Sequence, residues 1–535
     1  MEITSDFLVI GTGIAGLSFA LKAASKGTVS VVTKKETMDA STNYAQGGIA
    51  SVLDPYDSFD LHIADTLESG AGLCNEEVVR TVVTEGPGMI RELISLGVNF
   101  SRDKKEPDKL DLTQEGGHSR RRIVHADDLT GQEVERSLIR NVEGKSNIRI
   151  FEDHMAIDLI TTSKFLKRGL STNQTEETCW GAYVLDIHTG EVRTFLARVT
   201  VLATGGAGKV YLYTSNPDIA TGDGLAMGYR AGAKVANMEF VQFHPTCLFH
   251  PLAKNFLISE SVRGEGGRLI DKSGNHFMER YHPREDLALR DIVARSIDEE
   301  LKKSGDECVY LDISHRPPEF IKKRFPHIYQ KCLSLDIDIT QEPIPVVPAA
   351  HYMCGGLIAD KRGRTNINNL YAIGEVACTG LHGANRLASN SLIEALVFAK
   401  AAFEDGVKKI TQGDPHKFPP VPLWDPGSAT DSDESVVVSH NWDEVRRLMW
   451  NYVGIVRTNK RLIRAKRRIE VIQQEIKEYY WDFLITTDLV ELRNLATVAE
   501  LIINSASMRK ESRGLHYNLD YQERDDKNWR HDTVI

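Results

Sequence analysis

Apolar residues in the first part of the chain gather in short runs separated by turn residues. Runs at 7–10, 29–32, 199–202 and 370–373 have the length and composition of buried strands. A glycine-rich turn and an apolar stretch near 17–25 separate the first two runs, and that stretch predicts a helix. The resulting strand–turn–helix–strand order indicates a parallel sheet of the α/β class.

The pattern changes to helical spacing in the last part of the chain. A segment rich in Pro, Gly, Asp and Ser near 412–435 predicts a linker. Beyond it, two helix faces carry apolar residues every three or four positions: Leu462, Ala465, Ile469, Ile472 and Ile476, then Leu495, Ala499, Ile502 and Ala506. The basic run at 464–468 fits either a solvated helix face or a contact with a partner.

A long region separates the two halves of the parallel-sheet pattern. It contains a turn at 272–275, a helical stretch at 292–301 and a proline-rich exit at 343–348. An inserted domain explains the interruption. We therefore predict one discontinuous domain of residues 1–235 and 350–420, an inserted domain of residues 236–349, and a helical domain of residues 430–535.

Composition narrows the class of protein. The chain has 535 residues, 41% of them hydrophobic, and a formal charge of −10, which disfavours nucleic acid as the main partner. No apolar run is long enough to span a membrane, and Met1–Asp6 lacks the basic start of a signal peptide. The seven cysteines are dispersed without a CxxC pair, which is typical of reduced thiols and not of a metal site. We expect a cytoplasmic protein without a metal.

The segment Gly11-Thr-Gly-Ile-Ala-Gly16 has the spacing of a dinucleotide-binding turn, in which glycines let the backbone approach a pyrophosphate. The acidic residue that binds ribose in nicotinamide enzymes is missing, since Thr33-Lys34-Lys35 stands at the end of the second strand. A polar, glycine-ended loop follows at 41–48, which favours a flavin if it is not simply a surface loop.

A second candidate lies far downstream at 382–396. A polar loop with one arginine, Arg386, leads into the helix-capping residues Ser389-Asn390-Ser391 and then into an apolar helical run. The free N–H groups and positive dipole end of such a helix suit an anion or an electron-rich ring. An ordinary capped helix would have the same pattern.

Seven motifs together resemble the flavoprotein family of succinate dehydrogenase and fumarate reductase. They are Tyr44-Ala-Gln-Gly-Gly-Ile49, Glu115-Gly-Gly-His-Ser119, Ala203-Thr-Gly-Gly206, Thr221-Gly-Asp-Gly224, Gln242-Phe-His-Pro-Thr246, Arg263-Gly-Glu-Gly266 and His382-Gly-Ala-Asn-Arg386. The resemblance extends from Gly11 to His516. It implies an α/β FAD-binding (Rossmann-like) domain with an inserted α+β capping domain and a C-terminal helical bundle.

The resemblance also implies which residues hold FAD. The expected residues are Gly11, Thr12, Gly13, Ile14, Ala15, Gly16, Lys34, Ser41, Thr42, Asn43, Tyr44, Ala45, Gln46, Gly47, Gly48, Asp223, Glu375, Ser391 and Leu392. Respiratory members carry a histidine bonded covalently to flavin five residues before Gln-Gly-Gly. Ser41 occupies that position here, so we expect FAD to be held non-covalently.

For the substrate, the resemblance implies a four-carbon dicarboxylate bound by His244, Ser259, His351 and Arg386. Taken alone, either histidine would more commonly be a core or surface residue. Arg290 is expected to face the reacting carbons, with Glu260 and Arg263 as a relay behind it. A guanidinium suits this site because it forms two parallel hydrogen bonds to a carboxylate.

Glu115 distinguishes between substrates, because an extra carboxylate repels succinate but attracts the ammonium of an amino acid. The chain most closely resembles members of the family that oxidise L-aspartate, and in these a matching glutamate is thought to bind the ammonium. The neighbouring Arg120–Arg122 cluster either balances charge in the site or is exposed.

The resemblance therefore implies oxidation of L-aspartate to iminosuccinate by hydride transfer to flavin, with oxygen or fumarate as acceptor. This would be the first step of de novo NAD biosynthesis via quinolinate, with transient contact to quinolinate synthase. One alternative is a fumarate reductase or succinate dehydrogenase flavoprotein, against which Ser41 and Glu115 count. The other is a flavin protein acting on RNA, which the acidic composition disfavours.

Overall fold

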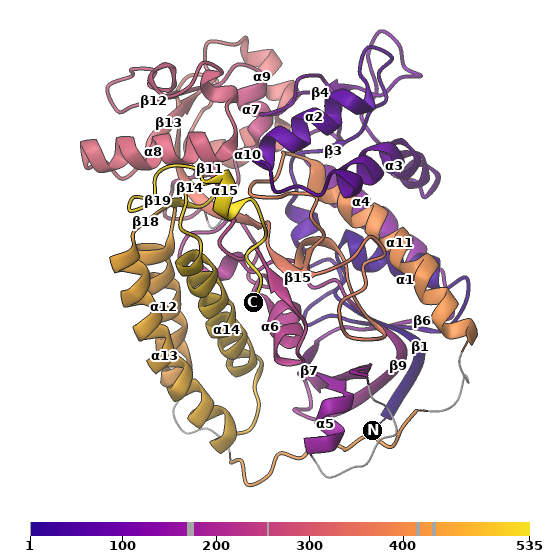
Figure 1. Cartoon of the computed structure of the whole chain (residues 1–535). Helices are drawn as coiled ribbons and strands as arrows, with labels where there is room; N and C mark the ends of the chain where they lie inside the picture. The colour runs from indigo at the N-terminus through magenta and orange to yellow at the C-terminus, as the bar shows by residue number, and fades with distance from the viewer. Residues whose placement is uncertain (1, 168–175, 254–255, 413–417, 431–434) are drawn as a thin grey trace.

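The structure is a computed structural model that describes residues 2–167, 176–253, 256–412, 418–430 and 435–535. Figure 1 shows a sheet domain at the lower right, a capping region at the upper left and a layer of C-terminal helices below that region. Parts of the predicted linker, 413–417 and 431–434, lie outside the described residues.

The core of the sheet domain is a seven-stranded sheet in which β1 and β9 are central. Its order is β6-β2-β1-β9-β8-β7, and β16 pairs with the second half of β9. The strands are β1 (Glu2–Ile10), β2 (Val29–Val32), β6 (Ile148–Phe151), β7 (His154–Thr161), β8 (Cys179–Asp186), β9 (Val192–Leu202) and β16 (Leu370–Ala372). All four predicted strand runs are found in this sheet, with β1 and β9 longer at their N-terminal ends than predicted.

Pairing is parallel where the sheet carries the dinucleotide-binding unit, between β1 and β2, β1 and β9, and β9 and β16. The strand β16 comes from a segment more than 160 residues after β9, so residues from both sides of the capping region build one sheet. Helix α1 (Ile14–Ala23) packs against α11 (Asn390–Gln412) and α4 (Thr130–Glu143). Helix α1 begins three residues before the predicted helix, directly after the glycine turn.

Other helices and short strands complete this domain. They are α2 (Phe59–Ser69), α3 (Glu76–Ser95), α5 (Thr162–Lys167), α6 (Asp223–Arg230), β3 (Ile49–Ala50), β4 (Leu112–Thr113), β5 (Ile123–Val124), β10 (Val235–Ala236), β15 (Gly356–Ile358) and β17 (Ala377–Cys378). The strands β3, β4 and β5 form a small antiparallel sheet that carries the polar loop 41–48 on one side.

The capping region is built on an antiparallel sheet of order β11-β14-β13-β12. Its elements are β11 (Val241–Leu248), β12 (Arg268–Ile270), β13 (Val309–Asp312), β14 (Ile344–Met353), α7 (Glu260–Gly264), α8 (Arg290–Ser304), α9 (Pro318–Arg324) and α10 (Pro326–Leu333). Helix α8 packs on β11 and β14 and thereby places its first residue beside the sheet domain.

In the proline-rich segment 343–348, predicted as an exit from the inserted domain, residues 344–348 form the first half of strand β14. The pairing of β11 with β14 has a register shift between His244–Ala349 and Cys247–Val347, and Pro245 and Pro348 lie within it. A proline cannot donate a ladder hydrogen bond, so it is tolerated at such a bulge. The bulge follows His244 directly and sets the direction of the strand there.

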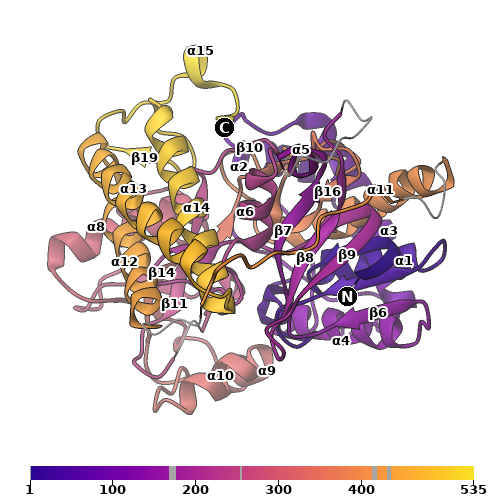
Figure 2. The same cartoon turned by 90° about the horizontal axis from the view of Figure 1, so that it is seen from below.

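The C-terminal layer contains α12 (Ser435–Val453), α13 (Asn459–Asp482) and α14 (Thr487–Met508), with a strand between α12 and α13 that pairs with a strand after α14, and a short last helix. These are β18 (Val456–Arg457), β19 (Tyr517–Asn518) and α15 (Asp526–Trp529). Both predicted apolar faces are buried. Figure 2 shows these helices as a separate layer beside the sheet, and α14 packs directly on α6.

The basic run at 464–468 is exposed except for Ala465. Arg468 forms an ion pair with Glu444, and Arg464 lies over the ring of Tyr452. These charged side chains are exposed in the single chain, and both alternatives, a solvated face and a partner contact, stay predictions. None of the described helices is long and apolar enough to cross a membrane.

Candidate active site

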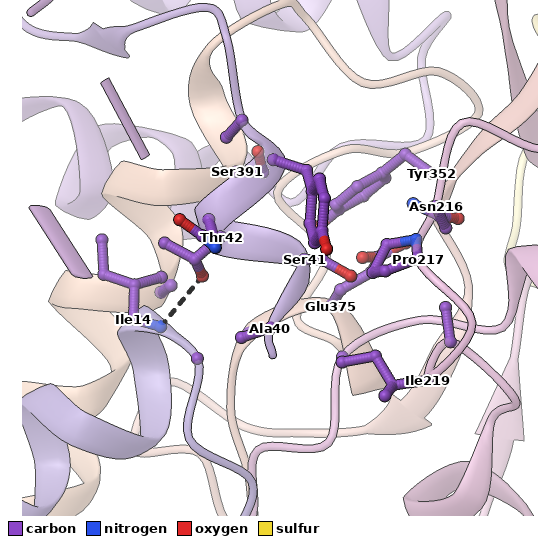
Figure 3. Close-up of a pocket in the computed structure, with 18 of the residues that line it drawn as sticks. Ile14, Ala40, Ser41, Thr42, Asn216, Pro217, Ile219, Tyr352, Glu375 and Ser391 are labelled. Atoms are coloured by element: carbon purple, nitrogen blue, oxygen red, sulfur yellow. Dashed lines mark hydrogen bonds between the residues drawn. The ribbon is translucent and has the colours of Figure 1, made fainter. Parts of the chain in front are cut away.

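A cavity of about 680 Å³ lies between the sheet domain and the capping region. Its size is typical of a site for a cofactor and a small substrate. Every residue predicted to hold FAD lines it except Gly16, and so do Glu115, His244, Ser259, Glu260, Arg290, His351 and Arg386. Figure 3 shows Ser41, Thr42, Tyr352, Glu375 and Ser391 converging on this space. Arg263 is buried behind the lining.

The glycine turn that opens the cavity cannot carry side chains at two positions. Gly11 has φ +112°, and a Cβ there would lie 2.3 Å from the carbonyl oxygen of Ala203. A Cβ on Gly16 would lie 2.0 Å from the Gly11 carbonyl oxygen, so this glycine serves the packing of α1 and not the cavity wall. The loop 41–48 is tied to the same turn, because the Ile14 N–H donates to Oγ1 of Thr42 at 3.1 Å (Figure 3).

Lys34 lies at the end of β2, where nicotinamide enzymes carry an acid. Its Nζ donates to Oδ2 of Asp223 at 2.8 Å and to Oγ1 of Thr221, and it forms an ion pair with Glu491 on α14. Asn494, one turn later on α14, donates to the other carboxylate oxygen of Asp223. The C-terminal layer therefore reaches the predicted cofactor residues directly.

Glu375 lies on the cavity wall between β16 and β17. Its Oε1 accepts from the Met353 N–H at 2.9 Å. Burial raises the pKa of this carboxyl to about 7, although the Met353 bond and Arg386 oppose that rise. A carboxyl of this kind can accept or donate a hydrogen bond near neutral pH.

Two arginines from different segments donate hydrogen bonds to the same glutamine. Arg290, the first residue of α8, and Arg386, in the loop before α11, both donate to Oε1 of Gln242 on β11. Gln242 is itself fixed, because its amide nitrogen donates to the Arg386 carbonyl and to Asn385. Arg386 also donates to Oγ of Ser391 at 2.6 Å and lies 4.2 Å from the Tyr352 ring centroid.

Glu260 lies behind Arg290 and joins it to a third arginine. Its Oε2 accepts from Nε of Arg290, and its Oε1 lies 3.1 Å from Arg263. Burial opposes ionisation of Glu260, but Arg290 and Arg263 outweigh it and hold the pKa of this carboxyl below its ordinary value. The carboxylate is thus ionised at neutral pH.

The two histidines are neutral and lie together. Burial, reinforced by Arg290, holds the pKa of His244 and of His351 well below the ordinary value. The ring centroids are 5.1 Å apart. Nδ1 of His244 accepts from the Thr246 N–H, so Nε2 carries the proton, and that buried nitrogen has no partner within the described residues. A ligand in the cavity would provide one.

Glu115 is 3% exposed and lines the same space. Burial and the nearby Glu260 raise the pKa of its carboxyl, while Arg290 counteracts them. Its Oε2 accepts from Oγ of Ser389 at 2.6 Å. This places a carboxylate among arginines without a direct ion pair to any of them.

The predicted caps of α11 have other partners. Ser389 bonds to Glu115, the Asn390 side chain to His62 and Thr66, and Ser391 to Arg386. Ser389 has a left-handed conformation, with φ +60°, and its Oγ accepts from the Gly48 N–H in the residue before β3. The helix start therefore organises the cavity wall, and Ser391 and Leu392 line it as predicted.

The three arginines at 120–122 lie in different environments. Arg120 and Arg121 are exposed, but Arg122 is fully buried and pairs with Asp57 and Asp65. Neither of the two alternatives therefore describes Arg122, which balances two carboxylates beneath the site.

Sequence reasoning missed Tyr352 and Ser389, which line the cavity, and Gln242, which lies behind the lining and holds Arg290 and Arg386. Gln242 stands in the motif that contains His244, but the register shift between Gln242 and Phe243 prevents a prediction of its position from strand alternation. Nothing in the sequence indicates that Ser389 bonds to Glu115, 274 positions away.

Comparison with known proteins agrees with this geometry. Residues 6–392 match the FAD binding domain family, and residues 442–535 match the fumarate reductase flavoprotein C-terminal family. A solved structure of a quinol fumarate reductase from E. coli is 30% identical, with a TM-score of 0.87 over 99% of this chain and 94% of that one.

Curated relatives are closer in sequence. L-aspartate oxidase 1 of Ralstonia nicotianae is 56% identical over 96% of this chain and 95% of its own length. L-aspartate oxidase of Pseudomonas aeruginosa is 54% identical over the same shares of the two chains.

The chain belongs to the L-aspartate oxidase family.

Membership of the L-aspartate oxidase family confirms the predicted fold class and FAD as the cofactor. The cavity fits FAD, since Gly11 brings the backbone of the turn to its edge and the loop 41–48 lines the space beyond the turn. The roles of individual cavity residues, and the domain boundaries, stay predictions.

Proposed function

We propose that this protein oxidises L-aspartate to iminosuccinate with FAD, as the first step of de novo NAD biosynthesis via quinolinate. The observation that best supports this is the buried Glu115 carboxylate in the same cavity as Arg290 and Arg386. A site for a plain dicarboxylate has no use for a carboxylate there, whereas the ammonium of aspartate pairs with it.

The charges at this end of the cavity balance those of an amino dicarboxylate. Arg263, Arg290 and Arg386 are positive, Glu115 and Glu260 are negative when ionised, and the two cavity histidines are neutral. One net positive charge remains, which matches the single net negative charge of L-aspartate. Succinate or fumarate, as dianions, would match only after Glu115 takes up a proton.

Arg386, Ser259 and the two histidines would bind the carboxylates. Arg386 is held in place by Gln242 and Ser391, so it can present its guanidinium with little loss of conformational entropy. Nε2 of His244 is a proton donor without a partner among the described residues, and a carboxylate oxygen would satisfy it.

Arg290 would face the reacting carbons. When bound, FAD supplies the hydride acceptor. A guanidinium with a pKa above about 12 is a poor base, so Arg290 acts on aspartate by position and charge, and as a proton donor when fumarate is reduced. Glu260 and Arg263 lie behind it and complete a path for that proton.

We further propose that FAD is held without a covalent bond, because Ser41 occupies the position of the flavin-linked histidine. Flavin that stays with the acid-precipitated polypeptide would contradict this. We place the protein in the cytoplasm, with oxygen or fumarate as electron acceptor and a transient contact with quinolinate synthase.

A second candidate is a fumarate reductase or succinate dehydrogenase flavoprotein, favoured by the similarity to quinol fumarate reductase. The two functions share the arginines and histidines and differ at Glu115. Substrate preference therefore separates them.

The test is a steady-state assay of the holoenzyme with L-aspartate, D-aspartate, succinate and fumarate side by side. We expect oxidation of L-aspartate and reduction of fumarate. Glu115→Gln should lower kcat/KM for L-aspartate about 10- to 100-fold, because a charge-assisted hydrogen bond is lost, and lower fumarate reduction far less. Equal losses would show that Glu115 does not bind the ammonium, and faster oxidation of succinate than of L-aspartate would favour the second candidate.

A further inference from the structure

Ser389 holds a backbone conformation that is costly for any residue but glycine. Its φ is +60°, and its side chain is buried between the flavin loop and Glu115. Non-glycine residues adopt this region rarely, and such strain persists where surrounding contacts require it. The Ser389 carbonyl accepts from the Ala50 N–H at 3.0 Å, which ties this residue to β3.

The hydroxyl of Ser389 is oriented by two bonds. Oγ accepts from the Gly48 N–H at 3.3 Å, and it donates to Oε2 of Glu115 at 2.6 Å. A backbone N–H can only donate, so the hydroxyl proton is left for Glu115. A hydroxyl that donates to a carboxyl favours its ionised form and fixes one of its two oxygens.

We propose that Ser389 is a positioning residue that makes the site selective for an amino dicarboxylate, by holding Glu115 ionised and oriented toward the substrate ammonium. The inference rests on the proposed function, because it requires that Glu115 bind that ammonium. Ser389 acts through Glu115 and not on the reacting carbons.

The surroundings of Glu115 explain why it needs this support. Burial and the neighbouring Glu260 raise the pKa of the Glu115 carboxyl, and Arg290 and Arg386 act against them without contacting it. The Ser389 bond is a direct contact that lowers that pKa. Without it, Glu115 takes up a proton at higher pH, and the neutral acid cannot pair with an ammonium but can tolerate a dianion.

The experiment uses Ser389→Gly in the FAD-loaded enzyme. Glycine accepts φ +60° without strain, so this change removes the hydroxyl and leaves the backbone conformation available. We expect KM for L-aspartate to rise and its kcat/KM to fall about tenfold. We also expect the acid limb of the kcat/KM profile for L-aspartate to move to higher pH, and fumarate reduction to decline less.

Three controls make the result specific. Ser389→Ala lacks the hydroxyl but keeps the strain, so it should show the same substrate split, and FAD bound per chain should be unchanged in both variants. Ser391→Ala removes a neighbouring hydroxyl that bonds to Arg386, so it should impair both substrates in parallel. In the Glu115→Gln background, Ser389→Gly should cause no further loss with L-aspartate.

The outcomes separate the two proposals. Unchanged aspartate kinetics in Ser389→Gly, a parallel loss for both substrates, or an additive loss in the double variant would overturn the role of Ser389 while Glu115 keeps its own. If Glu115→Gln leaves aspartate oxidation unchanged, the proposed roles of Glu115 and Ser389 both fall, whereas oxidation of L-aspartate itself stands.

Discussion

Arg122 is fully buried, although its neighbours Arg120 and Arg121 are exposed. Its guanidinium contacts two carboxylates, Asp57 at 2.8 Å and Asp65, and lies 3.3 Å from Nδ1 of His118. His118 in turn bonds to the Ala388 carbonyl beside Ser389. A structural ion cluster therefore supports the site from beneath.

We predict that Arg122→Met destabilises the protein by about 3–5 kcal/mol, because it leaves buried carboxylates without a counter-charge. The measurement is the urea midpoint of unfolding, with Arg120→Met as the control at an exposed neighbouring position. A midpoint as little changed by Arg122→Met as by Arg120→Met would refute the structural role.

Site residues could be predicted from the sequence where the chemistry of the site or the backbone conformation requires one residue type. Gly11 is required by its φ and by the nearby Ala203 carbonyl, and Arg386 by the dicarboxylate motif. The sequence was uninformative where a common residue obtains its role from a distant contact. Ser389 and Gln242 are of this kind, since a serine or glutamine has many partners available and only the fold selects one.

At the scale of elements, a side chain of the sheet domain caps the N-terminus of α10, the eight-residue helix of the capping region. Oδ2 of Asp128 accepts from the His327 and Ile328 N–H groups at 3.0 and 3.1 Å. This is the geometry of a helix N-cap, but the cap comes from 199 residues upstream. The bond joins the two sides of the cavity.

We predict that Asp128→Ala loosens α9 and α10 without unfolding the protein. Loss of an N-cap costs about 1–2 kcal/mol, so amide exchange of residues 318–333 should accelerate about 5- to 30-fold. Asp128→Asn keeps an acceptor oxygen and should show a smaller change. If amide exchange accelerated only in the C-terminal helices and was unchanged at 318–333, this role of Asp128 would be contradicted.

Elements with a regular apolar pattern were predicted well, including the buried faces of α13 and α14. The strand at 344–348 was not predicted, and the reason is physical. Prolines normally exclude a strand, but those of β14 lie at its start and at a bulge, where the pairing partner is another proline-containing strand. Local sequence does not reveal such a bulge.

For the whole molecule, helix α14 of the C-terminal layer contacts residues that are predicted to hold FAD. Glu491 and Asn494 of α14 hold Lys34 and Asp223 from outside the cavity. The family resemblance placed Lys34 and Asp223 at the cofactor, but no sequence pattern connects them with α14, which lies 457 positions after Lys34 and 271 positions after Asp223 at the contacting residues.

We predict that Glu491→Gln weakens FAD binding about five- to tenfold, because Asp223 then becomes the sole carboxylate partner of Lys34 and is less free to accept from the cofactor. Flavin fluorescence during titration of the apo-protein measures this. Asp488→Asn, an exposed acid on the same helix, is the control. Because coupling is reciprocal, FAD should slow amide exchange in α14, and equal exchange with and without FAD would argue against the link.

The pairing of β16 with β9 determines when the cofactor can enter during synthesis. The glycine turn is synthesised early, but the cavity wall also includes Glu375, Arg386 and Ser391. Lys34 can pair with Glu491 only after α14 has been synthesised. A nascent chain that ends before residue 375 has the turn but lacks these three residues of the cavity wall. Flavin insertion therefore follows translation of nearly the whole chain, and cells short of FAD should accumulate a fully synthesised apo-protein and not stalled fragments.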